Sequence, residues 1–328
     1  MRVSRIILGN ILVFLFLVSF IFPCGEIYYR FIYDTTDSFG LTKVTKNWLR
    51  QHYHFNRSGV RDTVNINSPE RPYVRRRISF IGDSFTVGYG IKNPEDRFVN
   101  RIRDRRQDWE VHLFASNALD TGAEIQGIQK ILQSGYQLDQ VVLVYNLNDI
   151  SDIVPEWHAI LDRIYRSSEP GFLVKHSYFL NTFYYHYVAS RDPDIKDYYR
   201  FVLLAYEGPI WEEQKKRLKF IKELIHQNGG SLKVVTFPFL HALGLNYPYR
   251  PVHEKLDDFW RSLGVPHLDL LPVYEVCPPG SLIINAHDAH PNRYAHQLAS
   301  YAIIEFLDKY LPLRKYQNIR TKMQVLTK

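Results

Sequence analysis

The sequence predicts an α/β protein: a three-layer, doubly wound (flavodoxin-like) domain with a parallel five-stranded sheet, preceded by an N-terminal transmembrane helix. Three observations lead to this prediction. The chain has five short runs that are almost continuously apolar, helix-length stretches between them, and one uncharged apolar run near its first residue. Strands that helices cover on both faces are apolar throughout, unlike the alternating strands of antiparallel sheets. A chain of 328 residues accommodates one large domain with attachments.

Residues 6–22 form an apolar run without a charged residue, preceded by Arg2 and Arg5 and closed by Pro23. The run is at the short end of the roughly 17 to 25 residues that span a bilayer. A secretory signal has the same basic start, but small residues precede its cleavage site, and Phe22 and Pro23 stand there instead. We therefore expect an uncleaved anchor over 1–25, with a cleaved signal as the alternative. The basic flank favours a cytoplasmic N-terminus, which places the remaining chain outside the bacterial inner membrane, in the periplasm.

The rest of the chain divides into a polar, irregular stalk over 26–70, a domain over 71–315 and a tail over 316–328. The expected strands of the domain are 77–81, 111–114, 141–146, 232–239 and 267–271. The expected helices are 95–106, 123–134, 211–227, 253–263 and 293–309. An insertion at about 150–210 carries the aromatic block SYFLNTFYYHYVAS, which we interpret as local core or, alternatively, as a lid or membrane-contacting surface.

Composition narrows the classes of partner. The formal net charge is +7, with arginines clustered at 75–77 and 101–106. A basic surface attracts nucleic acid, anionic lipid or acidic glycan. No finger, basic-zipper or RNA-binding signature accompanies the clusters, so we expect no nucleic-acid partner and keep acidic carbohydrate or lipid headgroups as the hypothesis. Two cysteines, Cys24 and Cys277, are too few for a disulfide scaffold or a Cys-based zinc site.

The first chemical signal is FIGDSFTVGYG, residues 80–90, directly after the first expected strand. Ser84 would lie past a strand end and near a helix start, where free backbone N–H groups point outward. A hydroxyl at such a place is activated by a neighbouring base, and the amides stabilise the oxyanion of acyl transfer. The pattern therefore indicates a nucleophilic serine.

This motif resembles the first block of the SGNH (GDSL-like) hydrolases, a superfamily with membrane-anchored bacterial members. Further matches follow in order: Gly122 after the second expected strand, Asn148 in VVLVYNLND after the third, and Asp288 with His290 in HDAHPNRYAH near the end. The joint match spans about two thirds of the chain, and it is more specific than any single piece.

The resemblance implies a catalytic Ser84, with His290 as its base and Asp288 orienting the imidazole. It also implies an oxyanion hole made by the N–H groups of Ser84 and Gly122 and by the amide of Asn148, without metal or cofactor. Two departures leave alternatives open. The Asp and His are separated by one residue rather than two, and the block around Gly122 is loose, so that Asn117 or Thr121 is an alternative donor. A metal site in HDAH, formed by His287, Asp288 and His290, is a further alternative, although three ligands in so short a stretch are sterically awkward.

Taken together, the sequence predicts a serine ester hydrolase acting on acyl, chiefly acetyl, esters of an extracytoplasmic substrate such as a polysaccharide or an ester-bearing small molecule. An O-acyltransferase using the same acyl-enzyme is one alternative. A noncatalytic envelope protein that binds a glycan or a partner is the other, because function resides in the site rather than in the fold.

Overall fold

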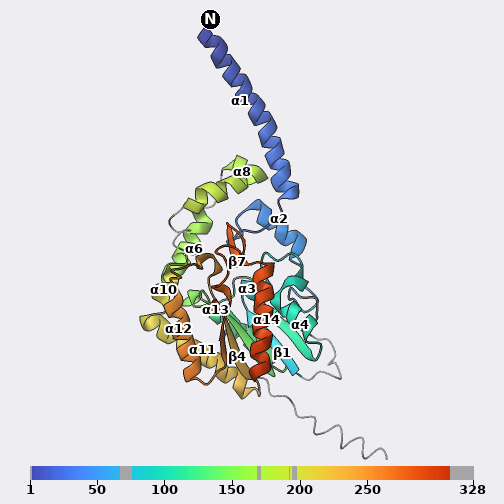
Figure 1. The fold of residues 1–328 in the computed structure, drawn as a ribbon, viewed down its shortest axis with the longest axis vertical. Helices are drawn as coiled ribbons and strands as arrows, with labels where there is room; N and C mark the ends of the chain where they lie inside the picture. Colours follow the sequence, from blue (N-terminus) through green and yellow to red (C-terminus); the bar gives the residue numbers. More distant parts are fainter. Residues whose placement is uncertain (1, 67–75, 168–170, 192, 194–197, 311–328) are drawn as a thin grey trace, which may run out of the picture.

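The computed structural model describes residues 2–66, 76–167, 171–191, 193 and 198–310 (Figure 1). The predicted tail over 316–328 lies outside them, as does the end of the predicted stalk. Five parallel strands form one sheet in the order β2-β1-β3-β4-β5, which confirms the predicted doubly wound fold. They are β1 (Arg76–Gly82), β2 (Trp109–Ala115), β3 (Gln140–Asn146), β4 (Ser231–Phe237) and β5 (His267–Asp269). Gly82 pairs with Ala115 on one side and Val144 on the other, so three strand ends meet at one edge.

Helices cover both faces of this sheet. They include α4 (Phe98–Arg105), α5 (Thr121–Gln133), α11 (Gly208–Gln227), α12 (Arg250–Ser262) and α14 (Arg293–Tyr310). Successive residues of a strand point to opposite faces. On β1, Phe80 packs its ring against Phe98 of α4, while the Ser79 hydroxyl contacts Tyr136, just after α5. α4 and α5 therefore lie on opposite faces, and both faces of β1 are buried as its apolar sequence predicts.

Two elements near the C-terminus were not predicted from the sequence. A short antiparallel hairpin joins β6 (Ile283–Asn285) to β7 (Asp288–Pro291). The expected strand over 267–271 stops at Asp269, and α13 (Leu271–Tyr274) begins two residues later. The Asp269 carboxylate accepts a hydrogen bond from the Leu271 N–H (2.9 Å), which turns the chain out of the sheet at that point.

The N-terminal helix α1 (Arg2–Ile27) continues through Pro23 rather than closing there, and the short helix η1 (Tyr28–Ile32) follows it. A proline removes only one donor from the helix ladder. The turn beyond it is held from outside, because Phe22 packs against Phe179 and Gly25 leaves room for the same ring. By length and composition, Ile6–Ile32 is one candidate membrane span.

The insertion after β3 folds into short helices. These are α6 (Pro155–Ser167), α7 (Phe172–His176), α8 (Tyr178–Phe183), η4 (Tyr184–Val188), η5 (Ala189–Arg191) and α10 (Phe201–Ala205). Figure 1 shows α8 beside the end of α1 that faces the domain. The aromatic block thus contributes to packing around α1, while other residues of the insertion pack on the main core.

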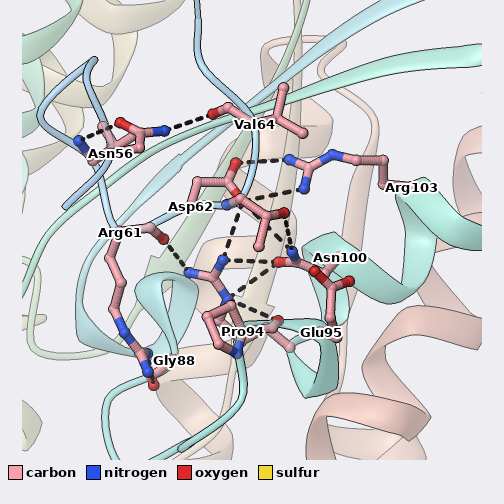
Figure 2. Close-up of polar contacts among 12 residues, drawn as sticks. Asn56, Arg61, Asp62, Val64, Gly88, Pro94, Glu95, Asn100 and Arg103 are labelled. Atoms are coloured by element: carbon pink, nitrogen blue, oxygen red, sulfur yellow. Dashed lines mark hydrogen bonds and ion pairs between the residues drawn. The ribbon is translucent and has the colours of Figure 1, made fainter. Parts of the chain in front are cut away.

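The segment between α1 and β1 is built into the domain, and it includes α2 (Lys43–His52). Figure 2 shows its Arg61 reaching towards Gly88, whose carbonyl oxygen accepts a hydrogen bond of 2.7 Å from Nη1. Burial lowers the pKa of Arg61 to about 10. The carboxylate of Asp62 binds the buried guanidinium of Arg97 (3.2 Å) and that of Arg103 (2.7 Å). A buried arginine network therefore fixes this segment against the turn that follows Ser84.

The arginines of the cluster 101–106 make contacts within the chain. On α4, Arg101 pairs with Asp96 (2.8 Å) and Arg103 with Asp62. Arg106 pairs with Asp308 and lies 4.0 Å from the centre of the Trp109 ring. Three of the four arginines in 101–106 are thus paired with carboxylates of the protein, and Arg105 donates to the Ser300 hydroxyl (2.8 Å). These contacts do not support the hypothesis that the cluster recognises an acidic ligand.

Candidate active site

Ser84 begins the short helix α3 (Ser84–Val87) directly after β1. Asp83 caps this helix, its carboxylate accepting a hydrogen bond of 2.9 Å from the Phe85 N–H. The turn is too tight for a side chain at Gly82, where a Cβ would lie 2.8 Å from the Val144 carbonyl oxygen and still closer to the Thr86 hydroxyl. Gly88 ends α3 in the left-handed conformation (φ 71°), which glycine adopts without strain. These residues place the serine hydroxyl at the carboxyl edge of the sheet.

His290 bridges Ser84 and Asp288. Its Nε2 lies 2.9 Å from the Ser84 Oγ, and its Nδ1 lies 2.6 Å from the Asp288 Oδ1. Both members of the pair belong to β7, where residues two apart point to the same side of the strand. This explains the one-residue spacing: a strand aligns Asp288 and His290, so no second intervening residue is needed.

Two rings hold the imidazole of His290. The centre of the Tyr89 ring lies 4.6 Å from the centre of the imidazole, and that of Phe85 lies 5.4 Å from it. Tyr89 is itself fixed, because its hydroxyl donates to the Asp37 carbonyl oxygen (3.1 Å). Packing therefore restricts the ring of His290 to the orientation that faces Ser84.

Ser84 and His290 line a cavity of about 380 Å³. Asn148 shares its wall, and its Oδ1 makes no hydrogen bond to any described residue. Besides Phe85 and Tyr89, the aromatic part of the wall comes from the segment before α2 and from the insertion: Phe39, Trp157, Tyr165, Tyr198 and Tyr199. The size falls within the range of pockets for small ligands.

Gly122, the expected oxyanion donor, is not among the residues that line this cavity. It lies in the first turn of α5, where a side chain would collide with the carboxylate of Asp152. Thr121 is likewise engaged, because its hydroxyl accepts from the Gln214 amide (2.7 Å). Instead the preceding loop, residues 117–120, reaches the cavity, and Ala118 in it has a left-handed backbone (φ 56°). Sequence gave no signal for that strained alanine, although Asn117 was an open alternative.

Behind Ser84 lie three fully buried carboxyl groups that the sequence analysis did not single out: Asp83, Glu124 and Asp149. Burial raises the pKa of Asp83, although the Phe85 N–H opposes the shift. Burial and the neighbouring carboxylates raise the pKa of Glu124 and Asp149 well above the usual range. Burial therefore disfavours the charged form of all three groups behind the serine.

His287, a member of the alternative metal site, stacks on His186, with ring centres 3.6 Å apart, and does not line the cavity at Ser84. Within the described ranges, no group of three His, Cys, Asp or Glu side chains is arranged to hold a metal ion. The Asp288 carboxylate is occupied by His290 and by the Thr36 hydroxyl.

No family model and no curated protein matches this chain. Among solved structures, it is similar to a lipolytic protein of the G-D-S-L family from Veillonella parvula (TM-score 0.42, 15% identity, 70% of this chain and 97% of that one). It is also similar to a putative G-D-S-L protein from Desulfitobacterium hafniense (0.45, 14%, 70% and 99%) and to an acetyl xylan esterase (0.45, 10%, 70% and 98%).

Proposed function

We propose that this protein is a serine ester hydrolase with Ser84 as nucleophile. The observation that carries the proposal is the hydrogen-bonded chain from Ser84 through His290 to Asp288, which opens onto a cavity at the carboxyl edge of the sheet. Ligands bind at this edge in open α/β sheets. A buried serine without a cavity would carry no such proposal.

In the first half-reaction, His290 Nε2 takes the Ser84 proton as Oγ attacks the ester carbonyl carbon, and Asp288 stabilises the imidazolium. The tetrahedral intermediate collapses, the alcohol leaves with the proton from His290, and an acyl-serine remains. Water then attacks the acyl group with His290 as base, which releases the carboxylic acid and restores Ser84. The proposed oxyanion donors are the Ser84 N–H, the Asn148 amide and an N–H of the loop 117–120.

The proposed substrate is a short acyl ester, such as an acetyl group, on a sugar. The cavity wall combines aromatic faces with tyrosine hydroxyls, and a sugar ring has an apolar face and a polar rim that match both. Transfer of the acyl group to a sugar hydroxyl would use the same acyl-enzyme, so the products must be identified with and without an oligosaccharide acceptor.

The test is hydrolysis of p-nitrophenyl acetate, butyrate and octanoate by the full chain in detergent micelles, beside Ser84→Ala. We expect turnover that decreases with acyl length and disappears in the variant. Absence of turnover in the wild type, or equal turnover in the variant, would favour the noncatalytic binding protein.

We also propose that α1 is retained as a membrane anchor with the catalytic domain outside. Glu26, at the end of α1, accepts hydrogen bonds from the Ser177 hydroxyl (2.7 Å) and the Phe179 N–H (3.1 Å) at the start of α8. Phe22, which a cleavage near residue 24 would remove, packs on Phe179 of the same helix, with ring centres 6.1 Å apart. The intact mass of the protein purified from membranes tests the proposal: we expect the full chain, whereas a mass lacking the first 24 or so residues would indicate a cleaved signal.

A further inference from the structure

Exposed apolar side chains outside α1 gather on the elements packed around its domain-facing end. Phe31 and Ile32 of η1 are 76% and 64% exposed, and Phe172 and Leu173 of α7 are 74% and 70% exposed. At the other end of α8, Phe183 and Tyr187 are half exposed and stack on each other at 4.8 Å. We call these six residues the apolar collar. Soluble proteins seldom expose so many large hydrophobic side chains on neighbouring elements without a partner.

The collar is held at a fixed place relative to α1. Tyr29 of η1 and Phe22 of α1 both pack on Phe179, with ring centres 6.0 and 6.1 Å apart. Glu26 binds the first turn of α8, as described above. Figure 1 shows the result, with α8 at the end of the domain from which α1 projects. The collar is therefore continuous with the surface of the candidate membrane span.

The composition of the same region identifies the partner. Residues 172–191 contain seven aromatic side chains, Lys175 and Arg191, and no acidic residue. Tyrosine is enriched at membrane interfaces, where its ring lies among headgroups, and basic residues at that level attract anionic lipid. Arg30 and Lys43 both lie over the ring of Tyr178, 4.9 and 5.0 Å from its centre.

We propose that the apolar collar lies in the headgroup region of the bilayer that α1 crosses, so that the lipid surface is its partner. This inference rests on the proposed anchor. The insertion would then have two roles, since α6 supplies Trp157 to the cavity wall and the following helices supply the collar. The cavity would be held at a set height above the membrane.

The test uses the full chain with both native cysteines changed to serine, reconstituted in two sets of nanodiscs. One set contains lipids with a quencher near the headgroup, which reports on the collar, and the other contains lipids with a quencher near the end of the acyl chain, which reports on Phe14. Single cysteines replace Phe172 or Phe183 in the collar and carry a fluorophore. Val276, 81% exposed and outside the collar, is the matched control, and Phe14 in α1 reports insertion of the anchor. We expect the collar probes to be quenched several-fold more than the Val276 probe.

Quenching at Phe14 together with collar probes that behave like Val276 would overturn the collar proposal while the anchor stands. No quenching at Phe14 would instead contradict the anchor. Protection of the collar probes by a co-purified protein, without quenching by lipid, would identify a protein partner and would also overturn the proposal.

A second, independent observation concerns the other oxygen of the Asp288 carboxylate. Oδ1 accepts from His290, through Nδ1 and through the backbone N–H (3.1 Å). Oδ2 accepts from the hydroxyl of Thr36, a residue 252 positions away in sequence. Both Thr36 and Asp288 are almost completely buried. The orientation of the carboxylate is thus determined from two sides.

Thr36 belongs to a strap, residues 35–38, that is tied to the β6–β7 hairpin. Asn285 donates its amide to the Thr35 hydroxyl (2.9 Å) and to the Thr36 carbonyl oxygen (3.0 Å). Ser38 donates its N–H to the His287 carbonyl oxygen (2.9 Å), and its hydroxyl accepts from the Ala289 N–H (2.9 Å). Four hydrogen bonds therefore tie the strap to the hairpin that carries His290, in addition to the bond from Thr36 to Asp288, and the Thr35 hydroxyl takes part in only one of the four.

We infer that Thr36 is a positioning residue for the proposed reaction: by donating to Oδ2, it keeps Oδ1 directed at His290. The inference rests on the proposed function. A hydrogen bond to a charged group is stronger than one between neutral groups, and a carboxylate that loses it gains rotational freedom. The chain that links the domain to α1 would thereby support the catalytic histidine.

The test compares Thr36→Val with Thr36→Ser and Thr35→Val, using ester turnover by the full chain. Thr36→Val is expected to lower kcat by about 10- to 100-fold at nearly unchanged KM and to shift the pH profile of kcat/KM. Thr36→Ser restores the hydroxyl and should restore kcat. Thr35→Val removes a neighbouring strap hydroxyl that does not contact Asp288, and it should leave kcat within about threefold.

Wild-type kcat and pH profile in Thr36→Val, or an equal loss in Thr35→Val, would overturn the inference. The low-field proton resonance of the His290–Asp288 hydrogen bond gives a readout without turnover. The chemical shift of this resonance should change in Thr36→Val and should stay at its wild-type value in Thr35→Val. If the wild type shows no Ser84-dependent turnover and the resonance still shifts in Thr36→Val, the positioning role of Thr36 stands and the proposed function is contradicted.

Discussion

Two regions of the molecule carry the same series of groups, a hydroxyl, a histidine and an aspartate, at similar hydrogen-bond distances. At the candidate site, Ser84 Oγ lies 2.9 Å from His290, which lies 2.6 Å from Asp288. In the sheet, Thr236 Oγ1 lies 2.9 Å from His267, which lies 3.1 Å from Asp257. Hydrogen-bond distances alone do not separate the two chains.

Their surroundings differ. Ser84 starts a helix beyond a strand end and lines a cavity, whereas Thr236 lies within β4 and is fully buried. Asp288 is buried and held by Thr36, whereas the side chain of Asp257 is 42% exposed. The hydroxyl of such a chain is therefore a candidate nucleophile only where substrate and oxyanion donors can reach it.

The largest expected difference between the two chains follows from removal of the hydroxyl. Ser84→Ala should lower kcat for p-nitrophenyl acetate by about 10⁵-fold, because the covalent route is lost. Thr236→Val removes the other hydroxyl at similar volume and should leave kcat of the folded protein nearly unchanged. Steady-state kinetics of both variants, with circular dichroism to confirm folding, checks the pair; equal losses would mean that the two chains are not functionally distinct.

At the aspartate the expected contrast is smaller. Asp288→Asn should lower kcat by about 10³-fold, since the amide no longer favours the tautomer in which His290 Nε2 accepts the serine proton. Asp257→Asn alters a half-exposed contact and should change kcat less than about threefold. The same kinetic assay distinguishes them, and a mild Asp288→Asn phenotype would assign Asp288 a structural role.

Oxyanion stabilisation is a feature that the Thr236 chain is not proposed to share. Asn148→Ala should lower kcat by about 10²-fold with a small change in KM, because one donor typically contributes about 3 kcal/mol in the transition state. Gly122→Ala, which would crowd Asp152, should instead lower the melting temperature while the folded fraction keeps its kcat. Loss of kcat in Gly122→Ala together with an unchanged kcat in Asn148→Ala would favour the Gly122 N–H as an oxyanion donor in place of the Asn148 side chain.

Buried histidines outside the candidate site are expected to affect the pH dependence of stability. Burial lowers the pKa of His296 to about 3 and that of His241 to about 4, from about 6.5 in the unfolded chain. Between about pH 6.5 and 4 these two histidines bind more protons in the unfolded chain, so they make the free energy of unfolding fall as the pH is lowered, whereas the raised pKa of Glu124 and Asp149 acts in the opposite direction. Calorimetry should therefore show that His296→Phe loses less stability, relative to the wild type, between pH 7.5 and 5; an identical pH dependence in the two proteins would contradict this assignment.

The five strands and their covering helices were predictable because apolar runs and amphipathic periods are local patterns. Asn148 and His290 were found from motifs at strand ends, which topology brings to one edge. The role of Thr36 had no sequence signal, since its partner lies 252 positions away. The loop at Ala118 was missed because its left-handed backbone occurs at a residue that does not favour it. Long-range contacts and backbone strain are properties of the folded chain.

The most direct test of the Ser84 assignment is labelling with a fluorophosphonate, followed by mass spectrometry of the peptides. It is applied to the wild type, Ser84→Ala and Thr236→Val under the same conditions. We predict one adduct, on Ser84, in the wild type and in Thr236→Val, and no adduct in Ser84→Ala. An adduct that persists in Ser84→Ala, or an unlabelled wild type, would contradict the proposal that Ser84 is an activated nucleophile.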